Sequence, residues 1–312
     1  MKSNRLMRAP AVAIAATALS LCSASSLAQL SGSVYCQAFA GNQTVLCVPS
    51  SIIDSAGRLL SSGSADASVN FGTDLFSAQT SAKSRSGYGN LGVDIEFSHF
   101  VSIGPDGGAS YSLGVADASF SDSLTVTSST LTIGAPVAVR VSGTLTGDEA
   151  TSLTQGNGQY SDLQRNLVAI LNVNGSQAMY VGYGAVDQLD GITHIATPNY
   201  SFSYVFETTV GTSVSFQGSL ISFLQAAIGG PGVGDAPPVQ STYSGSLSSF
   251  NSSHTYFDAV TAGVSLVSAS GALYASPVPM PNSSLLAGGG LVVLLTLAAL
   301  RKQAGKHRMS DQ

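Results

Sequence analysis

Apolar side chains recur at every second position in several stretches of this chain, and this pattern limits the fold more than any other feature. In residues 93–103 the apolar positions share one side, whereas Asp94, Glu96 and Ser98 share the other. A period of two is typical of β-strands with one buried face. The same alternation occurs at Val137, Val139 and Val141, then at Tyr200, Phe202, Tyr204 and Phe206, and again at Val214 and Phe216.

Glycine, proline and asparagine separate these runs, as expected for turns between short strands. Gly104–Gly108 and Asn174-Gly175 are two such turns, and Gly229–Pro238 is the longest loop candidate. We expect that loop to lie within one domain, because strand-like sequence resumes after it. Residues 161–171 fit both a strand and a short helix, and we favour the strand. The prediction is a single all-β domain over residues 29–275, folded as an antiparallel two-sheet, jelly-roll-like β-sandwich.

Charge is scarce and unevenly placed. The chain has 312 residues, of which 9% are charged, and its formal net charge is −5. Seven of the 12 basic residues lie before residue 29 or after residue 300, so the body keeps five basic and 16 acidic residues, a net charge of −11. An acidic surface repels phosphate backbones, so we expect no nucleic-acid partner.

The first 28 residues have the layout of a secretory signal peptide. Lys2, Arg5 and Arg8 precede an apolar stretch over residues 11–21, which we expect to be helical. Small residues then lead to a predicted cleavage between Ala28 and Gln29. Leu21 before Cys22 does not suit a lipoprotein signal, which needs a small residue at that position.

Cys36 and Cys47 are the cysteines that remain after the predicted leader, and export would bring them into an oxidising compartment. A hairpin with Gly41-Asn42 as a two-residue type II′ loop would place Cys36 directly opposite Cys47. Such a hydrogen-bonded pair has Cα atoms roughly 5.5 Å apart, within the range that a disulfide accepts. We therefore predict a Cys36–Cys47 disulfide. A zinc site is the rival interpretation, but no histidine or further cysteine lies nearby in the sequence.

Residues 276–312 contain three parts in a fixed order. Val278, Pro279, Met280 and Pro281 come first, an apolar run over residues 285–300 follows, and a basic tail over residues 301–312 begins with Arg301 and Lys302. The run is shorter than the ~20 residues that a membrane-crossing helix needs, so we expect one short hydrophobic helix. The basic residues behind it would stay on the cytoplasmic side and stop transfer.

This tripartite tail resembles the PEP-CTERM sorting signal of Gram-negative bacteria. The resemblance implies that an exosortase in the inner membrane recognises and processes the tail, and that the protein reaches the cell surface or the extracellular matrix. The usual motif is Val-Pro-Glu-Pro, and here Met280 stands at the place of the glutamate. A plain C-terminal membrane anchor is the alternative.

The sequence offers little for catalysis. A hydrolase would combine a nucleophile, a base and an orienting acid, and the body has three histidines, His99, His194 and His254. We expect each of them to be structural, and no cofactor, metal or catalytic residue is predicted. Pairs of aspartates, Asp117 with Asp122 on either side of a short strand and Asp187 with Asp190 in a loop, are weak candidates for calcium because their spacing does not concentrate the ligands.

Three functions remain, in this order. The first is a non-enzymatic surface or matrix protein associated with extracellular polysaccharide, as the resemblance implies. The second is a carbohydrate-binding module that stacks sugars on aromatic rings, for which the candidates are Tyr111, Tyr160, Tyr180, Tyr183 and Tyr243. The third is an exported hydrolase.

Overall fold

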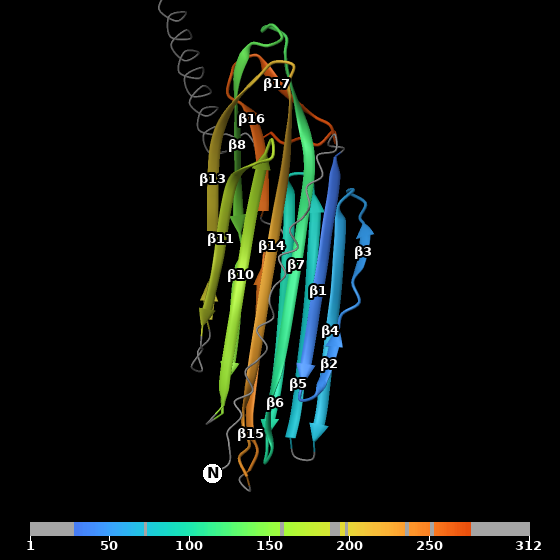
Figure 1. The fold of residues 1–312 in the computed structure, drawn as a ribbon, viewed down its shortest axis with the longest axis vertical. Helices are drawn as coiled ribbons and strands as arrows, with labels where there is room; N and C mark the ends of the chain where they lie inside the picture. The colour runs from blue at the N-terminus through green and yellow to red at the C-terminus, as the bar shows by residue number, and fades with distance from the viewer. Residues whose placement is uncertain are drawn as a thin grey trace, which may run out of the picture.

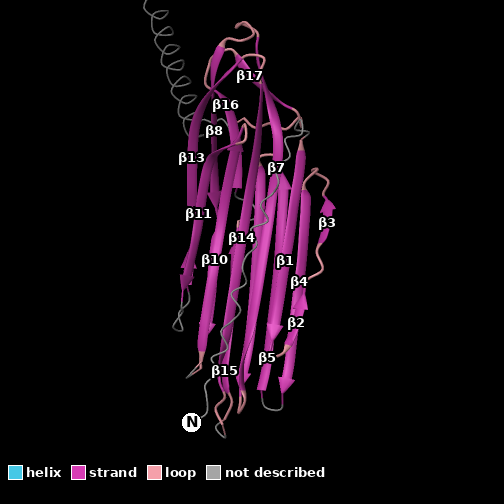
Figure 2. Cartoon of the chain, in the orientation of Figure 1, coloured by secondary structure: helices cyan, strands magenta, loops and turns pink. Residues whose placement is uncertain are grey.

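The computed structural model describes residues 28–71, 74–156, 159–187, 194–196, 199–234, 237–249 and 253–275. The predicted signal peptide up to residue 27 and the whole predicted sorting tail lie outside these residues. All regular structure in the described part is β-strand, as predicted (Figure 2). No helix in the described part is long and apolar enough to cross a membrane.

The strands form two antiparallel sheets, which we name sheet A and sheet B, that pack face to face as an elongated sandwich (Figure 1). Sheet A contains β1 (Gln29–Ala40), β2 (Gln43–Leu46), β7 (Gly107–Ser128), β10 (Tyr160–Val173), β11 (Ser176–Asp187), β14 (Ser213–Pro231) and β17 (Val264–Ser268). Its order is β11-β10-β14-β7-β1-β2, and β17 continues the β1 side of β7. The ambiguous residues 161–171 lie in β10, so the preference for a strand is confirmed.

Sheet B contains β3 (Ser50–Ile53), β4 (Leu59–Phe71), β5 (Asp74–Gly87), β6 (Asn90–Ile103), β8 (Pro136–Thr146), β9 (Asp148–Thr154), β12 (His194–Ala196), β13 (Asn199–Thr209), β15 (Val239–Ser248) and β16 (Ser253–Ala259). Strands β3 to β6 pair in sequence order. On its other side β6 pairs with β15 over most of its length and with β16 at its start. Sheet B therefore divides into two arms, β15-β9-β12 and β16-β8-β13.

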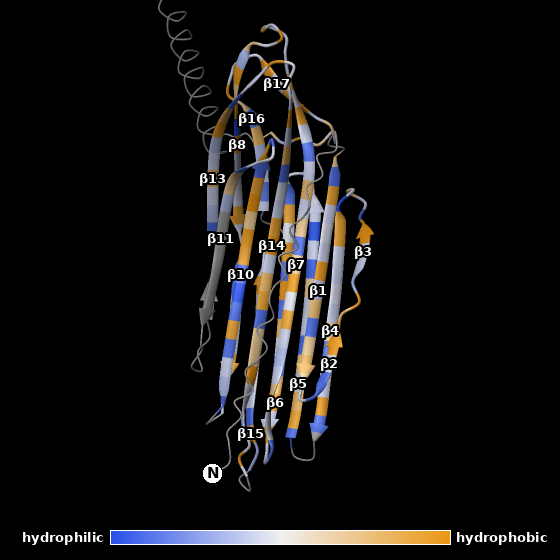
Figure 3. Ribbon diagram, viewed as in Figure 1, coloured by the Kyte–Doolittle hydropathy of each residue, from blue (hydrophilic) through white to orange (hydrophobic). Residues whose placement is uncertain are grey.

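The predicted alternation determines which side chains enter the core. Along β6, the side chains at Leu91, Val93, Ile95, Phe97, Val101 and Ile103 are all buried. The strand β14 behaves in the same way, with buried residues at every second position from Val214 to Ile228. Apolar and polar residues alternate along most ribbons in Figure 3 as this pattern requires.

The glycine-rich loop candidate begins later than expected. β14 continues through Gly229 and Gly230 to Pro231, which pairs with Gly107 at the start of β7. The two backbones approach so closely that a Cβ on Gly232 would lie 1.8 Å from the carbonyl oxygen of Pro105. Glycine is thus required for contact at this end of the molecule. The following loop leads from β14 in sheet A to β15 in sheet B, within one sandwich.

Two pairs of polar side chains join the two sheets inside the core. The Arg165 guanidinium on β10 and the Glu149 carboxylate on β9 form an ion pair at 2.7 Å, with their side chains 3% and 0% exposed. His99 on β6 and Ser112 on β7 join the sheets through an Nε2–Oγ hydrogen bond of 2.9 Å. Both contacts connect sheet A with sheet B inside the sandwich, so they fix how the sheets lie against each other.

Candidate functional site

The predicted disulfide is present. Cys36 and Cys47 are joined, with their Cα atoms 5.2 Å apart. Ala40 pairs with Gln43 across the two-residue loop, and the amide of Cys47 donates to the carbonyl of Cys36 at 2.9 Å. Gly41 has a φ of 58°, which agrees with the glycine position of a type II′ turn. The bridge closes the first hairpin, and Gly63 of β4 lies against its sulfur atoms.

The histidines lie on three different strands. His99 is 2% exposed, and burial lowers its pKa to about 3, so the ring is neutral. Its partner Ser112 is 1% exposed. The His99–Ser112 contact has the length of a nucleophile–base pair, but it lies inside the packed core where a substrate has no access. His254 lies half-buried on β16 beside the ring of Tyr256, and His194 begins β12.

Asp117 and Asp122 do not come together as a calcium site. Asp117 and Asp122 do not flank a short strand, as expected, but both lie within the single long strand β7. They point to opposite faces of it, since their positions differ by five. Asp122 is buried and accepts hydrogen bonds from the Ser270 hydroxyl and from the Tyr274 hydroxyl. Asp190 lies outside the described residues, and the described part holds no cluster of three metal-binding side chains.

The tyrosines considered for sugar stacking have different environments. Tyr243 is fully buried against Phe97. Tyr111, Tyr160 and Tyr180 all lie on the outer face of sheet A, and the last two are 53% and 59% exposed. The Tyr183 side chain lies outside the described residues.

The register of sheet A places further aromatic residues beside Tyr111. Three adjacent rows cross β1, β7, β14 and β10 on the outer face. The first row is Phe39, Tyr111, Ala227 and Asp162, the second is Gln37, Leu113, Gln225 and Gln164, and the third is Tyr35, Val115, Phe223 and Asn166. We call these twelve positions the platform.

The platform combines four aromatic rings with four amide side chains and a single charged group, Asp162. The Tyr35 hydroxyl donates to the amide oxygen of Gln37 at 3.2 Å. Burial, together with the nearby Tyr35, raises the pKa of Tyr111. That phenol therefore stays neutral at physiological pH, and the surface offers rings and amides with almost no charge.

The outer face of sheet B has a different chemistry. Its central positions carry mostly serine and threonine with several charged groups, including Asp66, Lys83, Asp94 and Glu96. Lys83 and Asp94 pair there at 3.3 Å. Because the two outer faces differ, the platform is a specific property of sheet A.

Sequence reasoning missed Tyr35, Phe39 and Phe223 as surface residues. A local signal existed for two of them: if Cys36 faces inward, then Tyr35, Gln37 and Phe39 must face outward. No such signal placed Phe223 beside them, because its position depends on the pairing of β14 with β7.

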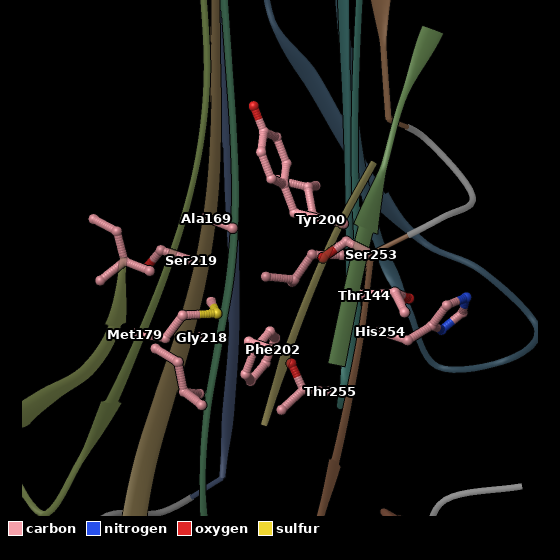
Figure 4. Close-up of a pocket in the computed structure, with 14 residues that line it drawn as sticks. Thr144, Ala169, Met179, Tyr200, Phe202, Gly218, Ser219, Ser253, His254 and Thr255 are labelled. Carbon is pink, nitrogen blue, oxygen red and sulfur yellow. The ribbon is translucent and has the colours of Figure 1, made fainter. Parts of the chain in front are cut away.

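Two cavities of the described part differ in size, and the larger, of ≈ 180 Å³, lies beside Phe257, Leu266 and Tyr274 and is lined mainly by apolar residues. The smaller cavity lies between the sheets near Met179, Tyr200 and Phe202, and its volume is ≈ 10 Å³ (Figure 4). That is the space of about one water molecule. The cavity near Met179 is therefore too small to hold a sugar.

Comparisons with known proteins add no family. No family model and no curated protein matches the sequence. Among solved structures the chain is similar to that in the crystal structure of infectious bursal disease virus VP2 subviral particle. The identity is 10% over 75% of this chain and 80% of that chain, with a TM-score of 0.15, which supports no conclusion about fold or function.

Proposed function

We propose that this chain is an exported, non-enzymatic protein of the cell surface or extracellular matrix, and that it binds extracellular polysaccharide through the platform. The observation that carries the binding proposal is the combination of rings and amides on one nearly uncharged outer face. Aromatic rings such as those of Tyr35 and Phe223 provide apolar stacking surfaces, and amides both donate and accept hydrogen bonds. Sugars present the matching groups, apolar C–H faces and hydroxyls.

Charge favours a neutral polysaccharide over an acidic one. The body carries a net charge of −11, and the platform contains no lysine or arginine to bind carboxylates or sulfates. An acidic polymer would be repelled by the body without a compensating contact. We therefore expect the ligand to be a neutral glucan-like or mannan-like chain.

The same surface would also suit the second candidate function, a carbohydrate-binding module, which would target an enzyme to its polysaccharide substrate. An exported hydrolase is less well supported, because the His99–Ser112 pair is sealed in the core and a histidine with a pKa of about 3 is a weak base. Loss of a hydrolytic activity on changing His194 or His254 would revive the hydrolase hypothesis.

The cellular location that we propose for the protein rests on the sequence alone. We propose cleavage between Ala28 and Gln29 during export across the inner membrane of a Gram-negative bacterium. We further propose that an exosortase processes the Val278–Pro281 motif, after which Arg301 and Lys302 stay behind with the apolar segment. The two terminal helices and the jelly-roll-like order of the strands stay predictions.

Polysaccharide binding is tested by co-sedimentation of the purified protein with insoluble neutral polysaccharides, including the matrix polysaccharide of the host. The variant Tyr35→Ala with Phe223→Ala removes two rings of one row, and we expect binding to fall at least tenfold. The control Ser64→Ala with Ser98→Ala changes two exposed side chains on the outer face of sheet B and should bind like the natural protein. Equal binding by both variants would exclude the platform, and absence of binding to any neutral polysaccharide would remove the binding proposal.

A further inference from the structure

Strand β13 forms one edge of sheet B. It pairs with β8 along its full length, from Asn199 with Thr146 to Thr209 with Pro136, without a register shift. No strand of the described residues pairs with its other side. Neighbouring residues Tyr204 and Val205 point to opposite faces, yet they are 47% and 48% exposed. Both faces of this edge are therefore open to solvent.

Natural sheet edges are usually protected by short length, by charge, by proline or by a bulge. The other edge strands of sheet B, β3 and β12, have four and three residues. β13 has 11 residues, with no proline, lysine or arginine, and Glu207 is its single charged residue. It therefore lacks the usual protection while offering a long row of backbone donors and acceptors.

Tyr204 is the most exposed ring of the aromatic ladder of β13, whereas Tyr200, Phe202 and Phe206 are partly buried. Tyr200 and Phe202 line the small cavity between the sheets, where Phe202 points toward sheet A (Figure 4). Toward the other end, β13 reaches past the β10–β11 hairpin (Figure 1). There the rings of Tyr204 and Phe206 stack on each other at 6.4 Å. Tyr204 is exposed, Phe206 is partly buried against the core, and both adjoin the unpaired backbone edge.

We propose that β13 binds β13 of a second copy of this chain, as an antiparallel pair about a two-fold axis. Such a pairing extends sheet B across the dimer and satisfies both free backbone edges at once. A segment with one charge is also compatible with a copy of itself, although two bodies of net charge −11 repel each other elsewhere.

Pairing of β13 over its full length defines one register. Pairing all 11 residues places Tyr204 opposite Tyr204 of the second copy, and Phe202 opposite Phe206 of that copy. All four rings of the ladder then stay on one face, because directly opposed residues share a face. Glu207 lies opposite Ser201 of the second copy, so no like charges meet. Aromatic cross-strand pairs of this kind stabilise antiparallel sheets.

The first test is the oligomeric state of the protein purified from its exporting host, measured by sedimentation without polysaccharide. We expect a concentration-dependent dimer for the natural chain. The variants Tyr204→Lys and Tyr204→Glu each place like charges opposite each other at the axis, and each should weaken dimerisation at least tenfold. Mixing these two variants should restore the dimer. The matched control, Ser244→Lys at an exposed position of β15, should dimerise normally.

The second test fixes the register by oxidation. A single cysteine at residue 204 should cross-link two copies, because directly opposed Cα atoms in an antiparallel pair lie about 4.5–5.5 Å apart. Ser201→Cys should not cross-link, since residue 201 would lie about 20 Å from its copy. A natural chain that stays monomeric at all concentrations, or a dimer that survives both charged variants, would overturn the proposal. Because the platform lies on the outer face of the other sheet, neither result depends on sugar binding.

Discussion

At the scale of single residues, the buried polar groups of the core carry the clearest consequences. His99 is held neutral between the sheets, whereas in the unfolded chain it would titrate near pH 6.5. As the pH falls, His99 therefore takes up a proton in the unfolded chain before it does so in the folded protein. The contribution of His99 to the free energy of unfolding is complete above pH 6.5 and declines as the pH falls toward 3.

This linkage predicts a loss of unfolding free energy on mild acidification. Between pH 6.5 and pH 5 the loss should approach about 2 kcal/mol. The variant His99→Gln removes the titrating group, so its stability should change less over the same interval. Urea denaturation of both proteins at several pH values measures the difference, and parallel pH profiles would contradict the buried, neutral His99.

The ion pair between Arg165 and Glu149 predicts a different outcome. Arg165→Met leaves the Glu149 carboxylate buried without its cation, which should cost about 3–5 kcal/mol of unfolding free energy. Changing Glu149→Leu as well should recover much of that loss, because no charge then remains buried. As a control, Lys83→Met breaks a pair whose lysine side chain is 47% exposed and should cost less than about 1 kcal/mol. Equal losses from Arg165→Met and Lys83→Met would show that the core pair is solvated.

At the scale of elements, the segment after β17 closes one end of the sandwich. Its Tyr274 ring packs among Phe120, Phe216 and Phe257. The Tyr274 hydroxyl donates to the Asp122 carboxylate at 3.0 Å, and burial with the nearby Asp122 raises the pKa of this phenol. Tyr274 is thus part of the folded body.

The closure by Tyr274 is testable with neighbouring variants. Tyr274→Ala should cost about 3–5 kcal/mol, because it leaves a cavity among three phenylalanines. Tyr274→Phe keeps the packing and loses one hydrogen bond to a buried carboxylate, which should cost about 1–3 kcal/mol. Leu273→Ala changes a side chain that is 96% exposed and should have little effect. Thermal denaturation ranks the three, and a Tyr274→Ala variant as stable as Leu273→Ala would show that the segment is not part of the core.

Strands and the local hairpin were predictable from the sequence, because their causes are local. Alternation identified β6, β8, β13 and β14, and the two-residue loop between β1 and β2 predicted the disulfide. Contacts between distant segments were not predictable in this way. Asp122 contacts Tyr274 only because the long strand β7 extends as far as the segment that follows β17. The sequence did not indicate how long β7 would be. The platform depends in the same way on the pairing of β1, β7, β14 and β10.

At the scale of the whole molecule, the two outer faces and the open edge suggest a division of roles. The platform on sheet A would hold polysaccharide, and the β13 edge of sheet B would join two copies. A dimer of this kind would present two platforms on one side, since a two-fold axis perpendicular to sheet B keeps both copies of sheet A on the same side. Such a molecule could link polysaccharide chains in an extracellular matrix.

The most direct test of this account is the mature mass and cell fraction of the protein in its host and in a strain without exosortase. A tag placed just after Gln29 follows the body in both strains. We predict that the host yields a surface or extracellular protein cut near Pro279, whereas the strain without exosortase retains the uncut chain in its inner membrane. An uncut chain in the inner membrane of both strains would contradict exosortase sorting and leave a membrane-anchored periplasmic domain.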